Sequence, residues 1–408
     1  MIKTYSKKKY FIYAAISLGI SYFIITLSTS KEDWYYFWRL VNMPVMWPPF
    51  ADIDHIHRSL LCKLNGFDPT LYNPCDINGI RYQYPIIWLP IFEFLRLNIL
   101  SNFKIFIFFT ISFYFIANFV LIDLAKKKFN KVVLILLFFS ASSLLLIERG
   151  NIDHIIFFLT VAMLASRNYF YEIILIFINS CLKIYPIFAF FYLIKNNKKP
   201  IITIVVLTLT IFLLYKISIA KYLDPNHSFM ALTQAYGVLT IIEGIFKTLE
   251  QEYLFFLNLD IKNLIRLISI LIFILICFFV FLIGLNNKTN TIIKGTKNQE
   301  KLFLIGASIY VGSYIFFSNI DYRLIFLFLT IPYVENLKPK INCLYCISVL
   351  IISNSWHIRL EPLTTNHIIF TSIIYIIKLT ILIFLCFWLG KISRNLLRNI
   401  KIKNFNVN

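Results

Sequence analysis

Apolar stretches of about 20 residues recur along this chain from residue 10 to residue 389, and they limit its fold more than any other feature. A helix of about 20 apolar residues is long enough to cross the hydrocarbon core of a bilayer. Lipid offers the backbone no hydrogen-bond partners, so each crossing segment has to be helical. Because 59% of the 408 residues are hydrophobic, little of the chain remains for a soluble domain. The sequence therefore predicts an all-α polytopic membrane protein, with one integral domain over residues 1–408.

Short clusters of lysine and arginine lie between the apolar stretches and predict the side that each loop faces. Cytoplasmic loops are enriched in these two residue types. The clusters occupy residues 3–9, 126–131, 195–199, 288–301, 338–340 and 391–403. If all of them face the cytoplasm, an even number of crossings separates each pair. This predicts about 12 transmembrane helices (roughly 11 to 13) in a plasma or inner membrane, with both termini cytoplasmic.

Two places in this topology depart from simple crossing helices. Residues 84–100 form an apolar stretch interrupted by Pro90, Glu93 and Arg96. The even count allows only one crossing between residues 84 and 126, and residues 105–124 supply it. We therefore expect residues 84–100 to lie on the membrane or to re-enter it. Residues 173–182 and 184–194 are each too short for an upright span, so we expect two half-helices that meet near Pro186.

Two long polar segments are then extracytoplasmic. They are residues 29–104, which would carry the membrane-lying helices, and residues 220–263. The net charge of +20 comes mainly from the basic clusters between the spans, and such clusters match an anionic lipid surface. We therefore expect membrane lipids, and not nucleic acid, to be the partner of these basic residues.

The first outer segment carries the candidate general base. If residues after Pro49 are helical, Asp54 and Arg58 are i,i+4 partners and form a structural ion pair, which leaves Asp52 to act. A carboxylate beside low-dielectric lipid can serve as a base. Two alternatives stay open. Asp52 could simply cap a helix that starts after the prolines, and Asp54 could be the functional acid in its place.

Cys62 and Cys75 lie in the same outer segment. Extracytoplasmic compartments are oxidising, which permits a disulfide between them. Gly66, Pro69 and Pro74 lie between the two cysteines and predict tight turns. These turns would fold the segment back toward the membrane, with a possible Cys62–Cys75 bridge.

Residues 148–154 join two apolar stretches through a turn that is rich in ionisable groups. Charges at membrane depth are costly and are usually paired or functional. Arg149 and Asp153 are therefore candidate functional residues. The structural alternatives are an ion pair between Arg149 and Asp153 or one between Glu148 and Arg149.

Two further polar groups interrupt the later apolar stretches. Lys183 stands beside Tyr185 at the predicted helix break, where it could meet a phosphate as a point charge or extend to the membrane interface. Asp321 and Arg323 form another outer turn. They could pair with each other, or Arg323 could bind an anionic headgroup.

In their order along the chain, these segments resemble the GT-C superfamily of polyprenol-phosphate-sugar glycosyltransferases, and within it the mannosyltransferase-like membrane proteins of glycosyltransferase family 87. The likeness covers roughly residues 10–332. It rests on Asp52 after the first span, the turn from Gly66 to Pro69, Tyr84-Pro85, the run from Arg149 to Asp153, the run from Leu182 to Pro186, and the run from Asp321 to Arg323. The family often has Tyr-Pro-Pro where this chain has Tyr84-Pro85-Ile86.

The resemblance implies an inverting transfer of a hexose, with mannose as one candidate, from a polyprenyl-phosphate donor to an extracytoplasmic glycan or glycolipid. Asp52 would deprotonate the acceptor hydroxyl. A leaving phosphate needs positive charge nearby, and the candidates for that role are Arg149, Lys183 and Arg323. The expected substrate-binding residues are Asp153, Tyr84, Tyr185 and Asp321. Neither a cofactor nor a divalent metal is expected.

Two other classes handle similar lipid-linked substrates. A lipid-linked glycan flippase or transporter would carry charged residues inside its spans, along a pathway. A polysaccharide polymerase or ligase would rely on arginine-rich outer loops, whereas the outer loops here are rich in aspartate and glutamate.

Overall fold

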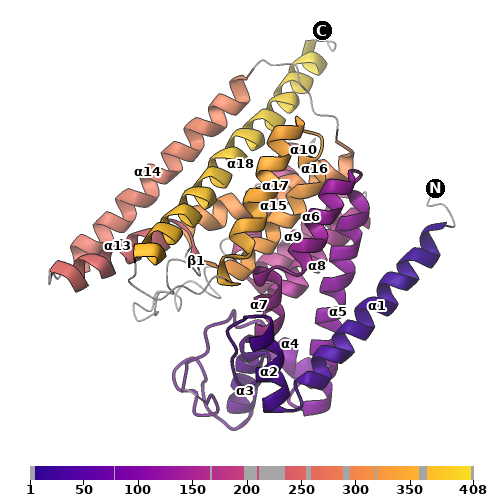
Figure 1. The fold of residues 1–408 in the computed structure, drawn as a ribbon, viewed down its shortest axis with the longest axis vertical. Coiled ribbons are helices and arrows are strands. Elements are labelled where there is room, and N and C mark those ends of the chain that lie inside the picture. Colours follow the sequence, from indigo (N-terminus) through magenta and orange to yellow (C-terminus); the bar gives the residue numbers. More distant parts are fainter. Residues whose placement is uncertain are drawn as a thin grey trace. The chain divides into compact units, whose positions relative to one another are not determined.

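The computed structural model of this chain is mostly helical (Figure 1). It describes residues 5–77, 79–165, 168–196, 209–210, 235–253, 259–287, 295–317, 319–357 and 365–405. The chain divides into two compact units, and each is described below by itself. The first contains residues 1–124 and 143–187, and the second contains residues 125–142 and most of the chain after residue 188.

The first unit is built from helices of the N-terminal half. They are α1 (Tyr5–Leu27), α2 (Lys31–Leu40), α3 (Ala51–Leu64), α4 (Trp88–Phe94), α5 (Leu100–Leu124), most of α7 (Ala141–Arg149), α8 (Asp153–Ala162), the 3-10 helix η1 (Met163–Ala165) and α9 (Tyr169–Leu182). The second unit contains α6 (Lys128–Phe138), α10 (Phe190–Asn196), β1 (Ala235–Tyr236), α13 (Val238–Tyr253), α14 (Leu259–Asn286), α15 (Lys297–Phe316), β2 (Asn319–Ile320), the 3-10 helix η5 (Asp321–Thr330), α16 (Ile331–Val334), α17 (Pro339–Ser353), η6 (Ser355–His357) and α18 (Thr365–Phe405).

Five helical segments among the described residues are long and apolar enough to cross a membrane. They are Lys9–Leu27, Leu100–Leu124, Lys128–Arg149, Ile261–Asn286 and Ile369–Arg394. Shorter apolar helices cover Asp153–Ala165, Tyr169–Leu182 and Pro339–Ser353. The expectation of an all-α membrane protein is thus confirmed, while the count of about 12 spans stays a prediction.

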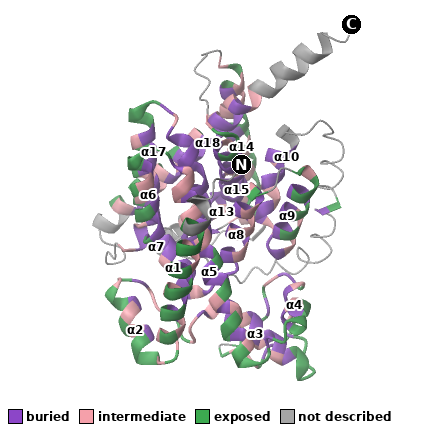
Figure 2. Cartoon of the chain, turned by 90° about the vertical axis from the view of Figure 1, so that its right-hand side faces the viewer, coloured by how far each residue is buried: buried purple, intermediate pink, exposed green. Residues whose placement is uncertain are grey.

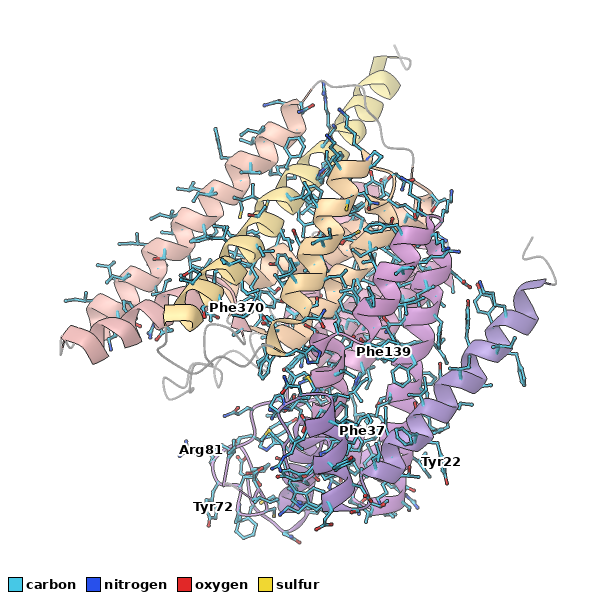
Figure 3. All side chains as sticks on the ribbon, in the orientation of Figure 1. Tyr22, Phe37, Tyr72, Arg81, Phe139 and Phe370 are labelled. Carbon is cyan, nitrogen blue, oxygen red and sulfur yellow. The ribbon has the colours of Figure 1, made fainter. Side chains whose placement is uncertain are left out.

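The long helices leave much of their apolar surface uncovered by protein, as lipid-facing helices do. Figure 2 shows the exposed residues along α1 in green, and Tyr22, which projects from this helix in Figure 3, is 66% exposed. The covered side of α1 packs against α5, where the Tyr13 and Phe119 rings stack at 4.7 Å. On the same interface, Ser112 Oγ donates a hydrogen bond of 2.9 Å to Ser21 Oγ. In lipid the hydrophobic effect does not drive helices together, so hydrogen bonds of this kind contribute to their association.

Both stretches that were predicted to depart from simple spans hold short helices and not one long helix, while the membrane-lying or re-entrant position of residues 84–100 stays a prediction. The stretch at residues 84–100 holds only α4, which has seven residues and is too short to cross a bilayer as a helix. Helix α9 ends at Leu182, and Lys183 takes an extended conformation. Pro186 follows in the 3-10 helix η2 (Tyr185–Ala189), where its ring cannot continue an α-helix.

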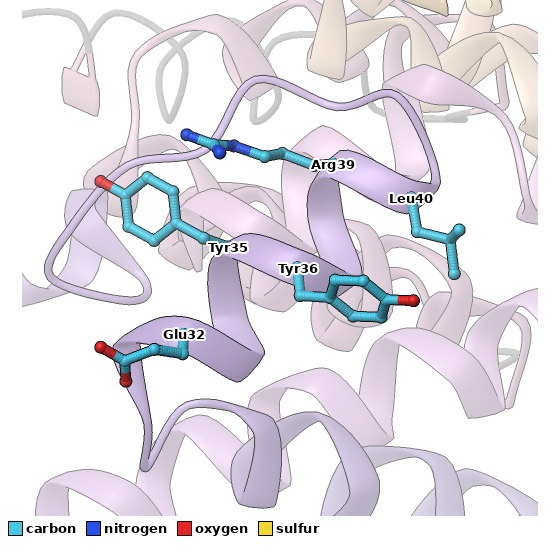
Figure 4. Close-up of a pocket in the computed structure, with 5 residues that line it drawn as sticks. All are labelled: Glu32, Tyr35, Tyr36, Arg39 and Leu40. Carbon is cyan, nitrogen blue, oxygen red and sulfur yellow. The ribbon is translucent and has the colours of Figure 1, made fainter.

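Helix α2 follows α1 directly and is amphipathic. Ser30 caps it by accepting a hydrogen bond from the Asp33 amide, and Trp34 and Trp38 are buried against the rest of the unit. Its outer side carries a surface hollow, shown in Figure 4. The hollow is lined by Glu32, Tyr35, Tyr36, Arg39 and Leu40, and none of the predicted site residues belongs to it. An aromatic and basic outer face of this kind is typical of a helix at a membrane–water interface.

Helices α14 and α18 lie side by side in the second unit (Figure 1). Two glycines allow this approach. A Cβ added at Gly284 would lie 2.0 Å from the carbonyl oxygen of Phe387, and one added at Gly390 would lie 2.0 Å from that of Phe281. Small residues at such contacts let helix backbones approach closely in lipid. Of the second outer segment, residues 220–263, positions 220–234 and 254–258 lie outside the described residues, and the remainder forms β1, α13 and the start of α14.

The α14–α18 contact predicts a strong effect of Gly284→Leu. The new side chain would collide with backbone and should lower the free energy of unfolding by about 1–3 kcal/mol. The measurement is the melting temperature of the purified full-length protein in detergent, followed by tryptophan fluorescence. Gly19→Leu is the matched control, because no heavy atom lies within 4 Å of the position its Cβ would take. Equal melting temperatures for the two variants would contradict this packing.

Candidate functional site

In the first unit, the turn between α7 and α8 contacts the chain at the start of α3. The Phe50 amide donates a hydrogen bond of 3.2 Å to the Glu148 carbonyl. Gly150 has a φ of +59°, and a Cβ added there would lie 2.6 Å from the Phe50 Cβ. Only glycine therefore permits both this backbone conformation and this close approach. The contact brings Asp52, in the first turn of α3, beside Asn151.

The side-chain amide of Asn151 links Asp52 to Lys183. Its oxygen accepts hydrogen bonds from Lys183 Nζ at 2.6 Å and from the Asp153 backbone amide at 3.1 Å. Because two donors approach this oxygen, the amide orientation is determined, and the NH2 group points the other way. There it donates a hydrogen bond to Asp52 Oδ2. Asn151 is fully buried, whereas Asp52 is partly exposed, so the linkage runs from the interior to the surface.

Lys183 is held at the end of α9 by a buried carboxylate. Its Nζ lies 2.7 Å from Asp153 Oδ1, and the side chains of Lys183 and Asp153 are 8% and 0% exposed. The ammonium also lies 5.8 Å from the centre of the Tyr84 ring. A buried lysine requires such a counterion, because desolvation of an unpaired charge is very costly. Lys183 therefore does not extend to the surface of the unit, because its ammonium is buried beside Asp153.

Glu148 anchors the opposite side of the same turn. Its Oε1 accepts a 2.6 Å hydrogen bond from the Met46 amide, and its Oε2 lies 3.1 Å from Arg149 Nε. Of the two structural pairs considered for Arg149, the pair with Glu148 forms. Consequently the two predicted phosphate-binding cations of this unit, Arg149 and Lys183, each contact a carboxylate in the structure.

Local geometry shows how the two aspartates at the start of α3 are placed, while the choice of Asp52 over Asp54 as the base stays a prediction. Asp54 Oδ2 lies 2.5 Å from Arg58 Nε, which confirms the predicted i,i+4 pair. The capping alternative for Asp52 is wrong, because Phe50 is the N-cap residue and the helix start has no side-chain cap. Asp54 is buried and paired in the described structure, and Asp52 is the more accessible of the two carboxylates.

Tyrosines and a histidine adjoin Lys183 and Asp52. His55 follows Asp52 by one helical turn, and its ring centre lies 6.1 Å from that of Tyr84. Tyr84 is therefore a neighbour of both the imidazole of His55 and the ammonium of Lys183. Tyr185 is also buried in this unit, at the start of η2.

The remaining predicted residues, Asp321 and Arg323, belong to the second unit. Both Asp321 oxygens lie 2.9 Å from Lys378 Nζ, which also donates a 3.0 Å hydrogen bond to the Ala235 carbonyl. The proposed pairing of Asp321 with Arg323 is therefore wrong. Arg323 Nη1 donates to Asn319 Oδ1 at 2.5 Å. The Asp321–Lys378 pair is fully buried and joins η5 to α18 beside the two-residue β1–β2 ladder.

This pair predicts that Lys378→Met is strongly destabilising, since it leaves the Asp321 carboxylate buried without its counterion. We expect a loss of about 3–5 kcal/mol, read from melting temperature in detergent. The double variant Lys378→Met/Asp321→Asn should recover part of that loss, because no buried charge remains. Lys340→Met, on the exposed side of α17, is the control and should be neutral. A double variant no more stable than Lys378→Met would contradict the account.

Cys62 and Cys75 are neighbours, but the structure contains them as free thiols, so the possible disulfide is not formed in it. Burial raises the pKa of the Cys75 thiol, and a hydrogen bond with Cys62 raises it further. A raised pKa lowers the thiolate fraction, and the thiolate is the reactive form.

The free thiols predict the redox state of the isolated protein. All seven cysteines should react with a maleimide after denaturation without reductant. Intact-mass spectrometry would count the adducts, with a reduced sample as the control. Five adducts before reduction and seven after it would instead show that a disulfide had formed.

Three residues of these networks were not among the predicted site residues. Asn151 lies inside the quoted run from Arg149 to Asp153, but its role depends on which side chains surround it. Glu148 was considered only as a partner for Arg149. Lys378 had a usable signal, because it is the one lysine in the apolar residues 368–389 of α18, and such residues usually have partners.

Comparisons of the chain with protein-family models, with curated proteins and with solved structures gave no match. Within the part of the chain that the structure describes, no group of three or more His, Cys, Asp or Glu side chains is arranged to hold a metal ion.

Proposed function

We propose that this chain is an integral membrane glycosyltransferase. It transfers a hexose, with mannose as one candidate, from a polyprenyl-phosphate donor to an extracytoplasmic glycan or glycolipid, with inversion at the sugar. About 12 spans with both termini cytoplasmic would put residues 29–104 on the extracytoplasmic side. The proposal rests on the motif order in the sequence, and its main structural support is the linkage from Asp52 through Asn151 to Lys183 and Asp153.

In this mechanism the Asp52 carboxylate takes the proton of the acceptor hydroxyl. The acceptor oxygen forms a bond to C1 of the donor sugar, and the bond from C1 to the phosphate oxygen breaks, which releases polyprenyl phosphate. Asn151 supports this role because its amide holds one carboxylate oxygen of Asp52 in place. A base positioned in this way typically contributes 10²–10⁴-fold to the rate.

Stabilisation of the leaving phosphate is assigned to the two cations of the first unit, Arg149 and Lys183. Lys183 and Arg149 contact Asp153 and Glu148 in the ligand-free structure, so a phosphate would have to share or replace those carboxylates. Lys183 therefore also acts as a positioning residue, since it fixes the Asn151 amide. Tyr84, Tyr185 and Asp153 are the proposed substrate-binding residues of the same unit.

A lipid-linked glycan flippase is the second candidate, because the Lys378–Asp321 pair puts charge on an apolar helix. Lys378 donates hydrogen bonds to Asp321 and to the Ala235 carbonyl, which favours a structural role for this lysine over a place in a transport pathway. A flippase would move the lipid-linked sugar and leave its bond to phosphate intact.

The proposal predicts that Asp52→Asn abolishes transfer while the protein still folds. The assay supplies a panel of labelled polyprenyl-phosphate hexoses to purified protein with a glycan acceptor. We expect the rate to fall by about 10²–10⁴-fold, because the amide cannot accept the proton. Asp33→Asn, an exposed aspartate in the first turn of α2, is the matched control and should keep full activity.

Two results would contradict this proposal, the first its choice of base and the second the function itself. Transfer by Asp52→Asn at the wild-type rate would exclude Asp52 as the base. Movement of the labelled donor across the bilayer of proteoliposomes, with no cleavage from any donor in the panel, would favour the flippase.

A further inference from the structure

His55 stands on the same side of α3 as the proposed base. It follows Asp52 by three residues, and side chains at this spacing are neighbours on a helix surface, about 5–6 Å apart at Cβ. A substrate that reaches Asp52 along this face therefore also passes His55.

The orientation of the His55 ring is fixed by Asp76. The distance from His55 Nδ1 to Asp76 Oδ2 is 2.9 Å, and Asp76 Oδ1 accepts a hydrogen bond of 3.1 Å from the Ile80 amide. Asp76 is thus held by its own turn and does not depend on His55 for its position. An ionised carboxylate only accepts hydrogen bonds, so Nδ1 carries the proton, and in the neutral ring Nε2 is the acceptor.

The Nε2 atom of His55 is buried and has no hydrogen-bond partner among the described residues. An unsatisfied buried acceptor costs about 1–3 kcal/mol, and such groups in native structures call for an explanation, a missing ligand among them. The residues around the imidazole indicate which kind of ligand would fit, because two of them are tyrosines. The Tyr82 ring stacks on the imidazole at 6.1 Å, and the Tyr84 ring, which also neighbours Lys183, lies at the same centre-to-centre distance.

We propose that His55 binds the acceptor and that the acceptor is itself a sugar. This inference rests on the proposed function. One hydroxyl of the acceptor sugar gives its proton to Asp52, and a second hydroxyl of the same sugar donates a hydrogen bond to His55 Nε2. Tyr84 offers an aromatic face for the sugar's C–H groups. Aromatic walls with a few placed polar groups are the usual lining of a site for a small polar ligand.

The ring of His57 provides an internal comparison on the same helix. Its nitrogens are also buried without a hydrogen-bond partner in the described part of the chain, but it stacks on Phe103 at 4.4 Å. It follows Asp52 by five residues, which turns it about 140° away around the helix axis. His57 should therefore not contact the acceptor.

The test uses purified full-length protein in detergent and compares His55→Phe with His57→Phe. Phenylalanine keeps the ring and its stacking but removes the acceptor nitrogen. We expect His55→Phe to raise the KM for the acceptor about 3- to 10-fold, the effect of one hydrogen bond, with the donor KM unchanged. His57→Phe should leave the acceptor KM at its wild-type value.

The variant Asp76→Asn tests whether Asp76 acts by orienting the His55 ring or only by stabilising the fold. In the wild-type background it should also raise the acceptor KM, because the ring loses its orientation. In the His55→Phe background it should not raise the acceptor KM further, since the imidazole would transmit the effect of Asp76 on the acceptor. A His55→Phe variant with wild-type acceptor KM, or equal losses for donor and acceptor, would overturn the inference while the Asp52 result still stood.

A binding measurement keeps the inference testable if no donor is turned over. Methyl α-hexopyranosides are added to the protein, and the melting temperature is followed by tryptophan fluorescence. Stabilisation of the wild-type and His57→Phe proteins, but not of His55→Phe, would support a sugar site at His55. No stabilisation of the wild type by any hexoside, or equal stabilisation of all three proteins, would overturn it.

Discussion

The organising interaction of the candidate site is the double hydrogen bonding of one buried amide. Asn151 accepts from Lys183 through its oxygen and donates to Asp52 through its nitrogen. An amide is suited to this position because it has both functions on one rigid group, whereas a carboxylate there would repel Asp52. The interaction joins the start of α3, the turn before α8 and the end of α9, three segments far apart in the sequence. Its formation depends on Gly150, which lets Phe50 approach the turn.

A second constraint is the pairing of charge in an apolar chain. Glu148 contacts Arg149, Asp153 contacts Lys183, and in the other unit Asp321 contacts Lys378. Pairing follows from the cost of desolvating a lone charge. It also bears on chemistry, because a cation that is already neutralised binds phosphate only by exchanging partners. Asp52 differs from these carboxylates, since its described partner is a neutral amide and part of its surface is open.

Several local features could be predicted from residue order alone. The helix break at Lys183 follows from Pro186, and the Asp54–Arg58 pair follows from helical spacing. The interruption of the apolar stretch at residues 84–100 follows from Pro90, Glu93 and Arg96, and the helix that forms there, α4, is short. The predicted partner of Asp321 was wrong for a physical reason. Arg323 lies two residues from Asp321, but Lys378 reaches the carboxylate from another helix, and sequence proximity gives no information about such a competitor.

By itself the sequence determined the all-α membrane class, because apolar length and the absence of backbone partners in lipid leave no other solution. It also determined which residues are able to ionise within the apolar chain, and that most of them would need partners. Only the tertiary structure decided which partners those are. Hydrogen bonds and ion pairs act over about 3 Å, so they depend on how distant helices pack, and local composition does not specify that packing.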